Sequence, residues 1–242
     1  MNPDPVATDP LPLPPEPSAI RHFPSHMRLW IAAVAGLAAD LWSKSWAFHT
    51  LSFDEKRPLW ADIVSLQLSL NPGALFGVGA GLAPIFVGAS VLALLFVLYL
   101  FAGSSPKRWS LHLALGLVLA GAIGNLYDRT TQTAYVVNDP NGRRDIGTLV
   151  AERQGQVVIT DFGKPEGIRR IYPTPTDPRS GPQPVVRDFI KIELISGKLW
   201  PWVFNIADAL LVVGVVMLLL NFWTERGPPQ APHADVNLAK PV

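Results

Sequence analysis

The chain has 242 residues, of which 49% are hydrophobic and only 16% are charged. Soluble domains usually carry about 25% charged residues, so the composition excludes an ordinary soluble surface. Twenty basic residues against nineteen acidic ones exclude the strongly basic surface that nucleic-acid binding needs. The absence of cysteine excludes disulfides, thiolate nucleophiles and zinc–cysteine sites. Long apolar runs alternate with proline-rich polar stretches, which predicts a membrane protein.

Four apolar segments are long enough to cross a bilayer as helices, which takes about 20 residues. They cover residues 29–48, 82–101, 109–127 and 203–223. Tryptophans stand at several of their ends, where amphipathic rings favour the membrane–water interface. We therefore expect an all-α membrane protein with four transmembrane helices and small extracytoplasmic elements that are β-rich or irregular.

The distribution of basic residues indicates an orientation. Lys107 and Arg108 lie between the second and third segments with no acidic neighbour, and arginines flank the first and last segments. Because cytoplasmic loops are enriched in Lys and Arg, we expect this loop and both termini in the cytoplasm. The 49–81 loop and the long 130–200 stretch then face outward.

The organisation along the chain follows from the same patterns. The first 27 residues contain eight prolines and few apolar side chains, which predicts a disordered tail. In the 130–184 stretch, short apolar pieces alternate with Gly and Pro, which predicts a β-rich or irregular insertion, and period-two spacing at 64–70 predicts a strand resting on the membrane interface. The expected parts are a tail at 1–27, helices with an outer loop at 28–129, the insertion at 130–184, a return segment with the last helix at 185–223, and a second tail at 224–242.

Acidic residues inside apolar segments are the candidates for chemistry, because a charge at the centre of a span costs about 2.5–3.5 kcal/mol. Asp40 lies one helical turn from Lys44, so these two residues are expected to pair. Asp128 has Arg129 beside it at a helix end. Asp208 lies about one and a half turns into the last apolar segment with no basic residue within helical reach, so it is expected to hold a proton or share one with a second carboxylate.

Two carboxylates that share one proton can hydrolyse a peptide bond, since the ionised member activates water and the protonated member hydrogen-bonds the carbonyl. Both Asp188 and Asp128 are candidate partners for Asp208, and spacing does not choose between them. His22 and His26 have the i, i+4 spacing of metal ligands, but the proline-rich tail disfavours a helical zinc site. No metal or cofactor is expected.

Four stretches together resemble the bacterial lipoprotein signal peptidase family (signal peptidase II), whose members are four-span aspartic endopeptidases. The family patterns are D-x-x-x-K, N-x-G-A-x-F, G-A-x-G-N-x-x-D-R, and V-V-D-F followed by F-N-x-A-D. The matching stretches are DLWSK at 40–44, NPGALF at 71–76, GAIGNLYDR at 121–129, VRDF at 186–189 and FNIAD at 204–208. Each stretch alone is a weak signal, whereas all of them at the expected span ends are highly specific.

The resemblance implies that Asp188 and Asp208 are the catalytic pair. It also implies supporting or substrate-binding roles for Asn71, Asn125, Asp128, Arg129 and Asn205, while Asp40 and Lys44 would hold the first helix in place. The implied substrate is a diacylglyceryl-modified prolipoprotein, cut before its lipidated cysteine on the outer face of the bacterial inner membrane. Membrane lipid and a globomycin-type inhibitor are further implied ligands.

Two features depart from the family pattern. Arg187 stands beside Asp188 where the family usually has a small apolar residue, and about 50 residues are inserted between Arg129 and Val185. Closure entropy grows only logarithmically with loop length, so such an insertion need not disturb the rest of the fold. The alternatives are a small proton-coupled transporter, in which Asp40 and Asp208 bind protons, and a catalytically silent scaffold that binds lipoprotein precursors.

Overall fold

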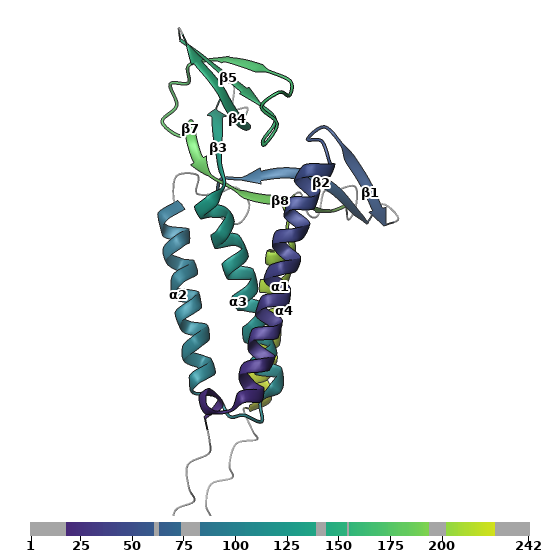
Figure 1. Ribbon diagram of the computed structural model, residues 1–242, viewed down its shortest axis with the longest axis vertical. Coiled ribbons are helices and arrows are strands. Elements are labelled where there is room, and N and C mark those ends of the chain that lie inside the picture. The colour runs from purple at the N-terminus through teal and green to yellow at the C-terminus, as the bar shows by residue number, and fades with distance from the viewer. Residues whose placement is uncertain are drawn as a thin grey trace, which may run out of the picture.

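The computed structural model describes residues 18–60, 63–73, 83–138, 144–153, 155–193 and 202–225. Within them, a short 3-10 helix η1 (Ala19–Arg21) precedes a bundle of four helices, and two antiparallel sheets lie at one end of that bundle (Figure 1). The start of the first helix and the end of the last lie at the opposite end. The helices are α1 (Phe23–Thr50), α2 (Ala83–Ala102), α3 (Trp109–Thr131) and α4 (Ile206–Glu225).

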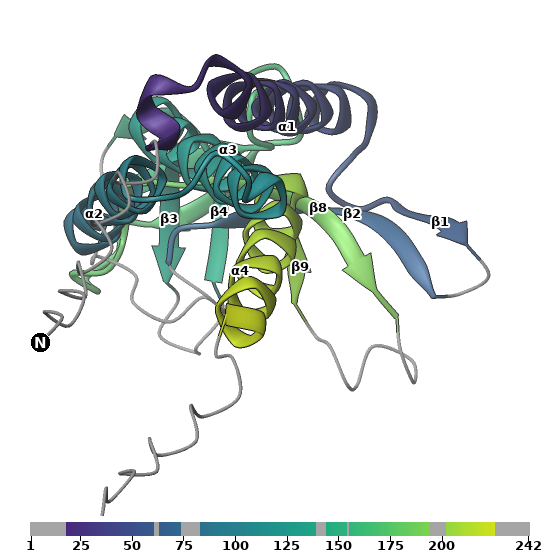
Figure 2. The same ribbon diagram turned by 90° about the horizontal axis from the view of Figure 1, so that it is seen from below.

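Helix α3 is the central helix and packs against α1, α2 and α4 (Figure 2). Small residues allow this close packing, because a Cβ atom added to Gly116 would lie 2.5 Å from the carbonyl oxygen of Leu29 and 2.7 Å from the Cβ of Ala32. On α1, a Cβ at Gly36 would lie 2.8 Å from the Cβ of Ala120. Small residues on both helices therefore bring α1 against α3.

The first sheet joins segments that are far apart in the sequence. Its central strands β2 and β8 are antiparallel, and Ser69 pairs with Asp188 while Asn71 pairs with Val186. The strand predicted at 64–70 is confirmed as β2, whereas its seat on a membrane interface stays a prediction. The strand order is β1 (Lys56–Trp60), β2 (Val64–Asn71), β8 (Val186–Ile192), β9 (Val203–Phe204).

The second sheet is built from the predicted insertion, whose β-rich character is confirmed. It begins directly after α3 and ends directly before β8, and its base is closed by pairing of Thr133 with Pro184 and by a 3.0 Å hydrogen bond from the Val185 amide to the Gln132 carbonyl. The insertion therefore leaves and rejoins the chain at one point. The strand order is β6 (Arg170–Pro173), β5 (Gln156–Thr160), β4 (Arg144–Arg153), β3 (Thr133–Asn138), β7 (Gly181–Pro184).

A shared hydrophobic core joins both sheets to the end of α1. Phe162, in the loop after β5, packs edge-on against Phe48 with ring centroids 6.2 Å apart. Lys164 Nζ donates to the carbonyl oxygen of Leu51 at 3.2 Å, which satisfies an acceptor just beyond the end of α1. The insertion thus packs against the end of α1 and the first sheet. The buried members of this core are Ala47, Phe48, Leu51, Leu66, Leu68, Leu70, Ala134, Val185 and Phe189.

The expectation of an all-α protein with four transmembrane helices is wrong. Two antiparallel sheets occupy much of the described chain, and within it only two helices, Trp109–Thr131 and Ile206–Thr224, are long and apolar enough to cross a membrane. The apolar helical segment Val87–Ala102 is shorter, and α1 carries Asp40 and Lys44. The prediction counted the segments that form α1 and α2 as spans, although Asp40 and Lys44 interrupt the apolar run of α1.

Three predicted boundaries also shift. The N-terminal tail was expected to reach residue 27, but α1 already begins at Phe23, with Pro24 in its first turn where the missing amide costs nothing. The last helix begins at Ile206 rather than at 203, because Val203–Phe204 pairs with β8. Its final turn includes Thr224 and Glu225, and residues 1–17 and 226–242 lie outside the described residues.

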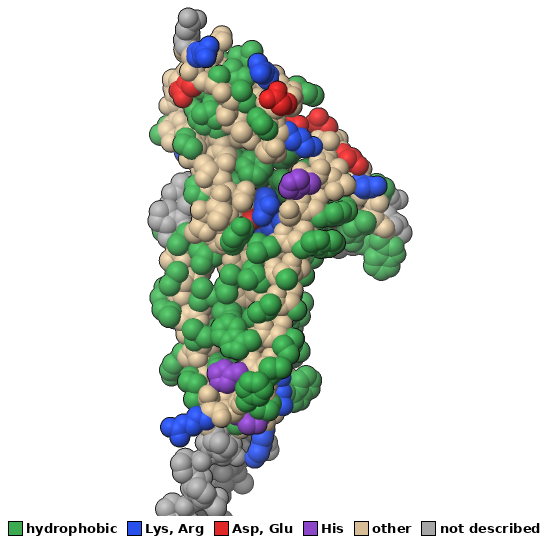
Figure 3. Space-filling view, viewed as in Figure 1, with side chains coloured by type: hydrophobic (Ala, Val, Ile, Leu, Met, Phe, Trp, Pro, Cys, Tyr) green, Lys and Arg blue, Asp and Glu red, His purple; other side chains and the backbone are tan. Residues whose placement is uncertain are grey.

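Apolar side chains also cover the outside of the bundle (Figure 3). On α4, Val212 is 65% exposed and Leu219 is 63% exposed, and on α2 Leu92 is 67% exposed. Such a continuous apolar surface is stable in lipid and unfavourable in water. The charged side chains that Figure 3 shows gather toward the two ends of the molecule.

Replacing Phe162 by Ala is expected to lower the free energy of unfolding by about 1–2 kcal/mol, because a half-buried aromatic ring leaves the core shared by the two sheets. Thermal unfolding followed by tryptophan fluorescence in detergent measures this loss. Ile168→Ala is the matched control in the same insertion, since Ile168 is 72% exposed. Equal effects of the two substitutions would mean that the insertion does not stabilise the fold through Phe162.

Candidate active site

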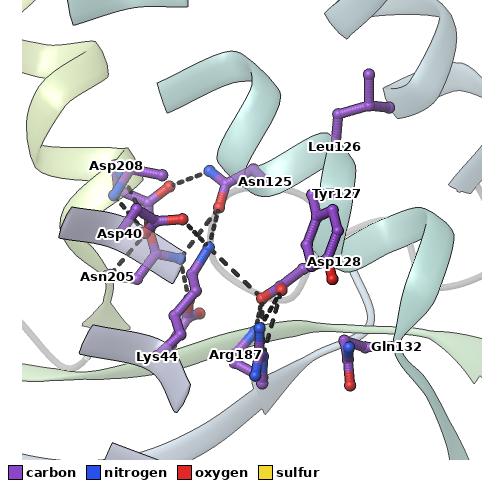
Figure 4. Close-up of polar contacts among 12 residues, drawn as sticks. Asp40, Lys44, Asn125, Leu126, Tyr127, Asp128, Gln132, Arg187, Asn205 and Asp208 are labelled. Atoms are coloured by element: carbon purple, nitrogen blue, oxygen red, sulfur yellow. Dashed lines mark hydrogen bonds and ion pairs between the residues drawn. The ribbon is translucent and has the colours of Figure 1, made fainter. Parts of the chain in front are cut away.

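The nine polar residues predicted from the sequence all fall within the described residues and come from α1, β2, α3, β8 and α4. They converge where the ends of α1 and α3 and the start of α4 meet the first sheet. Figure 4 shows six of them, namely Asp40, Lys44, Asn125, Asp128, Asn205 and Asp208. Local structure positions each of them, and hydrogen bonds connect them across the elements.

Asn205 and Asp208 form a reciprocal cap at the start of α4. The Asn205 side chain accepts a hydrogen bond from the Asp208 amide at 3.0 Å, and the Asp208 carboxylate accepts one from the Asn205 amide at 3.2 Å. This is the capping-box arrangement, which also favours a negative charge at the helix N-terminus. Asp208 therefore lies in the first turn of its helix, not one and a half turns inside an apolar span as predicted.

Asp188 lies on β8 and is 2% exposed. Its Oδ1 accepts a hydrogen bond from Asn205 Nδ2 at 2.7 Å, and Asn71 on β2 also hydrogen-bonds this carboxyl. Burial raises the pKa of the Asp188 carboxyl well above its usual value, and the negative charge of Asp208 raises it further. Asn205 thus contacts both carboxyl groups, and Asp188 is the member that favours a bound proton.

Asn125 on α3 ties Asp208 to the rest of the site. Its Nδ2 donates to Asp208 Oδ1 at 2.8 Å, while its Oδ1 accepts from Lys44 Nζ and from Asn205 Nδ2, each at 3.2 Å. The two donors on the oxygen side fix the orientation of the amide, so its NH2 group points at the carboxylate. Asp208 is half-buried, and its two carboxylate oxygens accept hydrogen bonds from Asn125 and from the Asn205 amide.

The predicted pair of Asp40 and Lys44 is confirmed, with Lys44 Nζ 2.8 Å from Asp40 Oδ2 and both side chains fully buried. Asp40 has a second contact that the sequence did not predict. Its Oδ1 accepts a 2.8 Å hydrogen bond from the Ala207 amide, so α1 supplies a carboxylate to the N-terminus of α4. This contact positions the helix turn that carries Asp208.

Asp128 is paired with Arg187 rather than with its sequence neighbour Arg129. Arg187 Nη2 lies 2.7 Å from Asp128 Oδ1, and the Arg187 amide donates to Asp128 Oδ2 at 3.0 Å. Lys44 Nζ lies 3.5 Å from the same Oδ2. These partners occupy both oxygens of Asp128, so the geometry favours Asp188 over Asp128 as the neighbour of Asp208.

Arg129 extends in another direction. Its Nη2 donates to the carbonyl oxygen of Gly73 at 2.8 Å, next to the turn in which Asn71 Oδ1 accepts from the Gly73 amide at 3.0 Å. The Arg129 charge also interacts with the carboxyl groups of Asp188 and Asp208. Arg129 therefore links the end of α3 to the Asn71 turn and places a positive charge near both acids.

Some contacts at the site were not predicted. From the sequence, Arg187 is only a departure from the family pattern. The one sequence signal for its pairing with Asp128 is their opposite charge, because the two residues are far apart in the chain. Within the described residues, no group of three or more His, Cys, Asp or Glu side chains is placed to hold a metal ion. The His22 ring hydrogen-bonds Ser25, and the His26 ring hydrogen-bonds the Ile20 carbonyl oxygen.

Gly124→Ala is expected to impair both stability and activity, because the added methyl group would clash with the buried Asp40 carboxylate. Such overpacking typically costs about 1–3 kcal/mol. The matched control is Gly88→Ala on α2, where nothing lies within 4 Å of the added Cβ. In that exposed helix position Ala is expected to stabilise by up to about 1 kcal/mol. Unfolding curves of both variants check the prediction, and a neutral Gly124→Ala would contradict it.

Asp188→Asn is expected to stabilise the protein increasingly as pH rises. In the folded state the pKa of Asp188 is raised, so its contribution to stability is fully present below the ordinary carboxyl pKa and is lost as pH rises through the raised value. Asn keeps the acceptor for Asn205 and does not ionise. Melting temperatures measured across pH 4–9 should diverge toward high pH, and parallel curves for the variant and the wild type would refute this.

Comparison with known proteins was made by sequence and by fold. The family model for signal peptidase (SPase) II matches residues 32–224. The lipoprotein signal peptidase of Rhodopirellula baltica is 31% identical over 209 residues, covering 85% of this chain and 75% of that protein. The lipoprotein signal peptidase of Desulfitobacterium hafniense strain DCB-2 is 26% identical over 194 residues, covering 80% of this chain and 91% of that protein.

Two solved structures, each described as a "bacterial membrane enzyme structure by the in meso method", share the fold. They superpose with TM-scores of 0.56 and 0.53 at 18% identity, covering 81% and 79% of this chain and 88% and 90% of theirs. The match of the family model over most of the chain argues against the transporter and the silent scaffold. The chain belongs to the signal peptidase II family, membrane enzymes that remove signal peptides from prolipoproteins.

Proposed function

We propose that the protein is an aspartic endopeptidase in which Asp188 and Asp208 carry the reaction. The single observation that carries this proposal is the position of Asn205, whose side chain bonds Asp188 at 2.7 Å while its backbone and side chain cap Asp208. One residue thus holds two carboxyl groups together. Two adjacent carboxyl groups do not both ionise readily, so the pair holds one proton near neutral pH.

The environments assign a role to each acid. Asp188 is almost fully buried, and burial raises the pKa of its carboxyl, so it is the protonated member. Asp208 is half-buried at a helix N-terminus, and its two oxygens accept hydrogen bonds from Asn125 and from the Asn205 amide, so the proposal places the shared proton on Asp188. In this assignment Asp208 is the general base and Asp188 is the general acid.

The reaction then follows from these two protonation states. Asp208 takes a proton from water as the water oxygen attacks the scissile carbonyl carbon, and Asp188 gives its proton to the carbonyl oxygen. The resulting gem-diol collapses as Asp208 delivers its proton to the leaving nitrogen and a diol hydroxyl returns a proton to Asp188. One peptide bond and one water become a carboxyl group and an amine, and the pair regains its single proton.

The substrate is a diacylglyceryl-modified prolipoprotein that is cut just before its lipidated cysteine. The apolar outer surface of the bundle supports this assignment, because the lipid chains and the signal helix stay in membrane lipid while the scissile bond reaches the polar site at the helix ends. A globomycin-type cyclic peptide is expected to bind the same site and inhibit cleavage. The reaction uses no metal and no cofactor.

The protein lies in the bacterial inner membrane with both termini on the cytoplasmic side and the site on the outer side. Lys107 and Arg108 precede α3 at the end of the bundle opposite the site, which supports this orientation. Helices α3 and α4 run in opposite directions, and among the described helices these two are long and apolar enough to cross a membrane. Both sheets then lie outside the cytoplasm.

Asp188→Asn and Asp208→Asn are each expected to lower cleavage of a lipidated precursor by about 10²–10⁴-fold, since each removes an acid–base group. A gel-shift assay with purified protein in detergent or bicelles measures the loss. Asp177→Asn is the matched control, because Asp177 pairs with Arg179 at an exposed position on the insertion.

Each variant must also retain the wild-type elution profile and melting transition. Cleavage at near wild-type rate by either Asn variant would remove the proposed pair, whatever the behaviour of the control. Loss of activity in Asp177→Asn of the same size would show that the assay reports general damage rather than catalysis.

A further inference from the structure

We propose that Arg187 is a positioning residue of this enzyme: acting through Asp128, it anchors β8 to α3 and sets the pH range in which the two catalytic carboxyls hold one proton. The proposal rests on the proposed function of Asp188 and Asp208. It assigns a role to a residue that the sequence comparison with the family marked only as a departure.

The contact between Arg187 and Asp128 is unusually complete. The guanidinium engages Asp128 through Nη2 at 2.7 Å and through Nε at 3.2 Å to Oδ1 and 3.3 Å to Oδ2. The amide of the same residue donates to Asp128 Oδ2 at 3.0 Å. The Asp128 side chain is fully buried and that of Arg187 is 11% exposed, so water screens this pair little.

This contact determines where both acids lie. Arg187 immediately precedes Asp188 on β8, and Asp128 lies one helical turn after Asn125, whose amide bonds Asp208. The pair therefore connects the strand that carries one acid to the helix that orients the other. Figure 4 shows Arg187 reaching Asp128 beside Lys44 and Asn125.

The balance of buried charge gives the second part of the role. The site would hold four negative and three positive charges if all its charged side chains were ionised. It becomes neutral when Asp188 and Asp208 share one proton. Without Arg187 the same protonation state would carry a net negative charge, which favours uptake of a second proton. The charged groups that face the site are Asp40 and Lys44 from α1, Asp128 and Arg129 from α3, Arg187 and Asp188 from β8, and Asp208 from α4.

Arg187→Val tests the charge directly, since Val is well suited to a strand. The rate of precursor cleavage plotted against pH is expected to be bell-shaped. In Arg187→Val both limbs are expected to move upward by roughly half to one pH unit. This shift is smaller than for a direct ion pair, because Arg187 acts across Asp128. Arg187→Lys keeps the charge and is expected to keep the limbs at their wild-type positions while losing part of the rate. Arg179→Gln, which removes an exposed arginine from the insertion, is the control and should leave the profile unchanged.

The double variant Arg187→Val with Asp128→Asn separates charge from anchoring. Removing one positive and one negative charge restores the balance, so the limbs are expected to return toward the wild-type pH while the rate stays low because the anchor is gone. If Arg187→Val lowers the rate without moving either limb, or if Arg187→Lys moves them as far as Val does, the proposal is overturned. The Lys and double variants decide the question where the Val variant fails to fold.

Failure of this proposal is distinct from failure of the proposed function. If the Asn variants of Asp188 and Asp208 are inactive but the limbs of the pH–rate profile do not move in Arg187→Val, the catalytic pair stands and only the role of Arg187 is lost. Activity of those Asn variants would instead remove the pair itself and leave the pH profile of Arg187→Val to be explained by other groups.

Discussion

A nearly fully buried carboxyl group beside a half-buried one is the constraint on which the rest of this structure depends. Each buried charge is costly unless it is paired or hydrogen-bonded, so the groups around Asp188 and Asp208 have to offset that cost. Asn205, Asn125 and the N-terminus of α4 supply donors, and Lys44 with Arg129 supplies positive charge. The polar network at the ends of α1 and α3 is therefore needed to offset the cost of burying Asp188 and Asp208.

The insertion is compatible with this network because of where it is closed. Gln132 and Val185 are joined by a hydrogen bond at its base, so the chain returns to β8 at the place where it left α3. With the insertion in place, Arg187 reaches Asp128 and β8 pairs with β2. The insertion contacts the end of α1 through Phe162 and Lys164. Through Phe162 it also contributes to the hydrophobic core that both sheets share.

Local relations were predictable from the sequence and non-local ones were not. The Asp40–Lys44 pair and the β2 strand follow from helical and period-two spacing, and both were predicted. The partner of Asp128 was not, because Arg187 is 59 residues away and only the closed base of the insertion brings it near. The four-span fold failed for a related reason: counting apolar residues records neither strand pairing nor the buried charges of α1. The catalytic pair itself came from the family resemblance, since spacing left Asp128 and Asp188 open.

Two contacts that lie close together in the sequence hold the start of β8 to the end of α3. Val185 bonds Gln132, and Arg187 bonds Asp128. Val185 and Arg187 are two residues apart at the start of β8, and Asp128 and Gln132 are four residues apart, one helical turn, at the end of α3. A strand with a small apolar residue at 187 would retain only the amide contact to Asp128. The side-chain contact of Arg187 with Asp128 therefore adds a second attachment between α3 and the strand that carries Asp188, next to the base of the insertion.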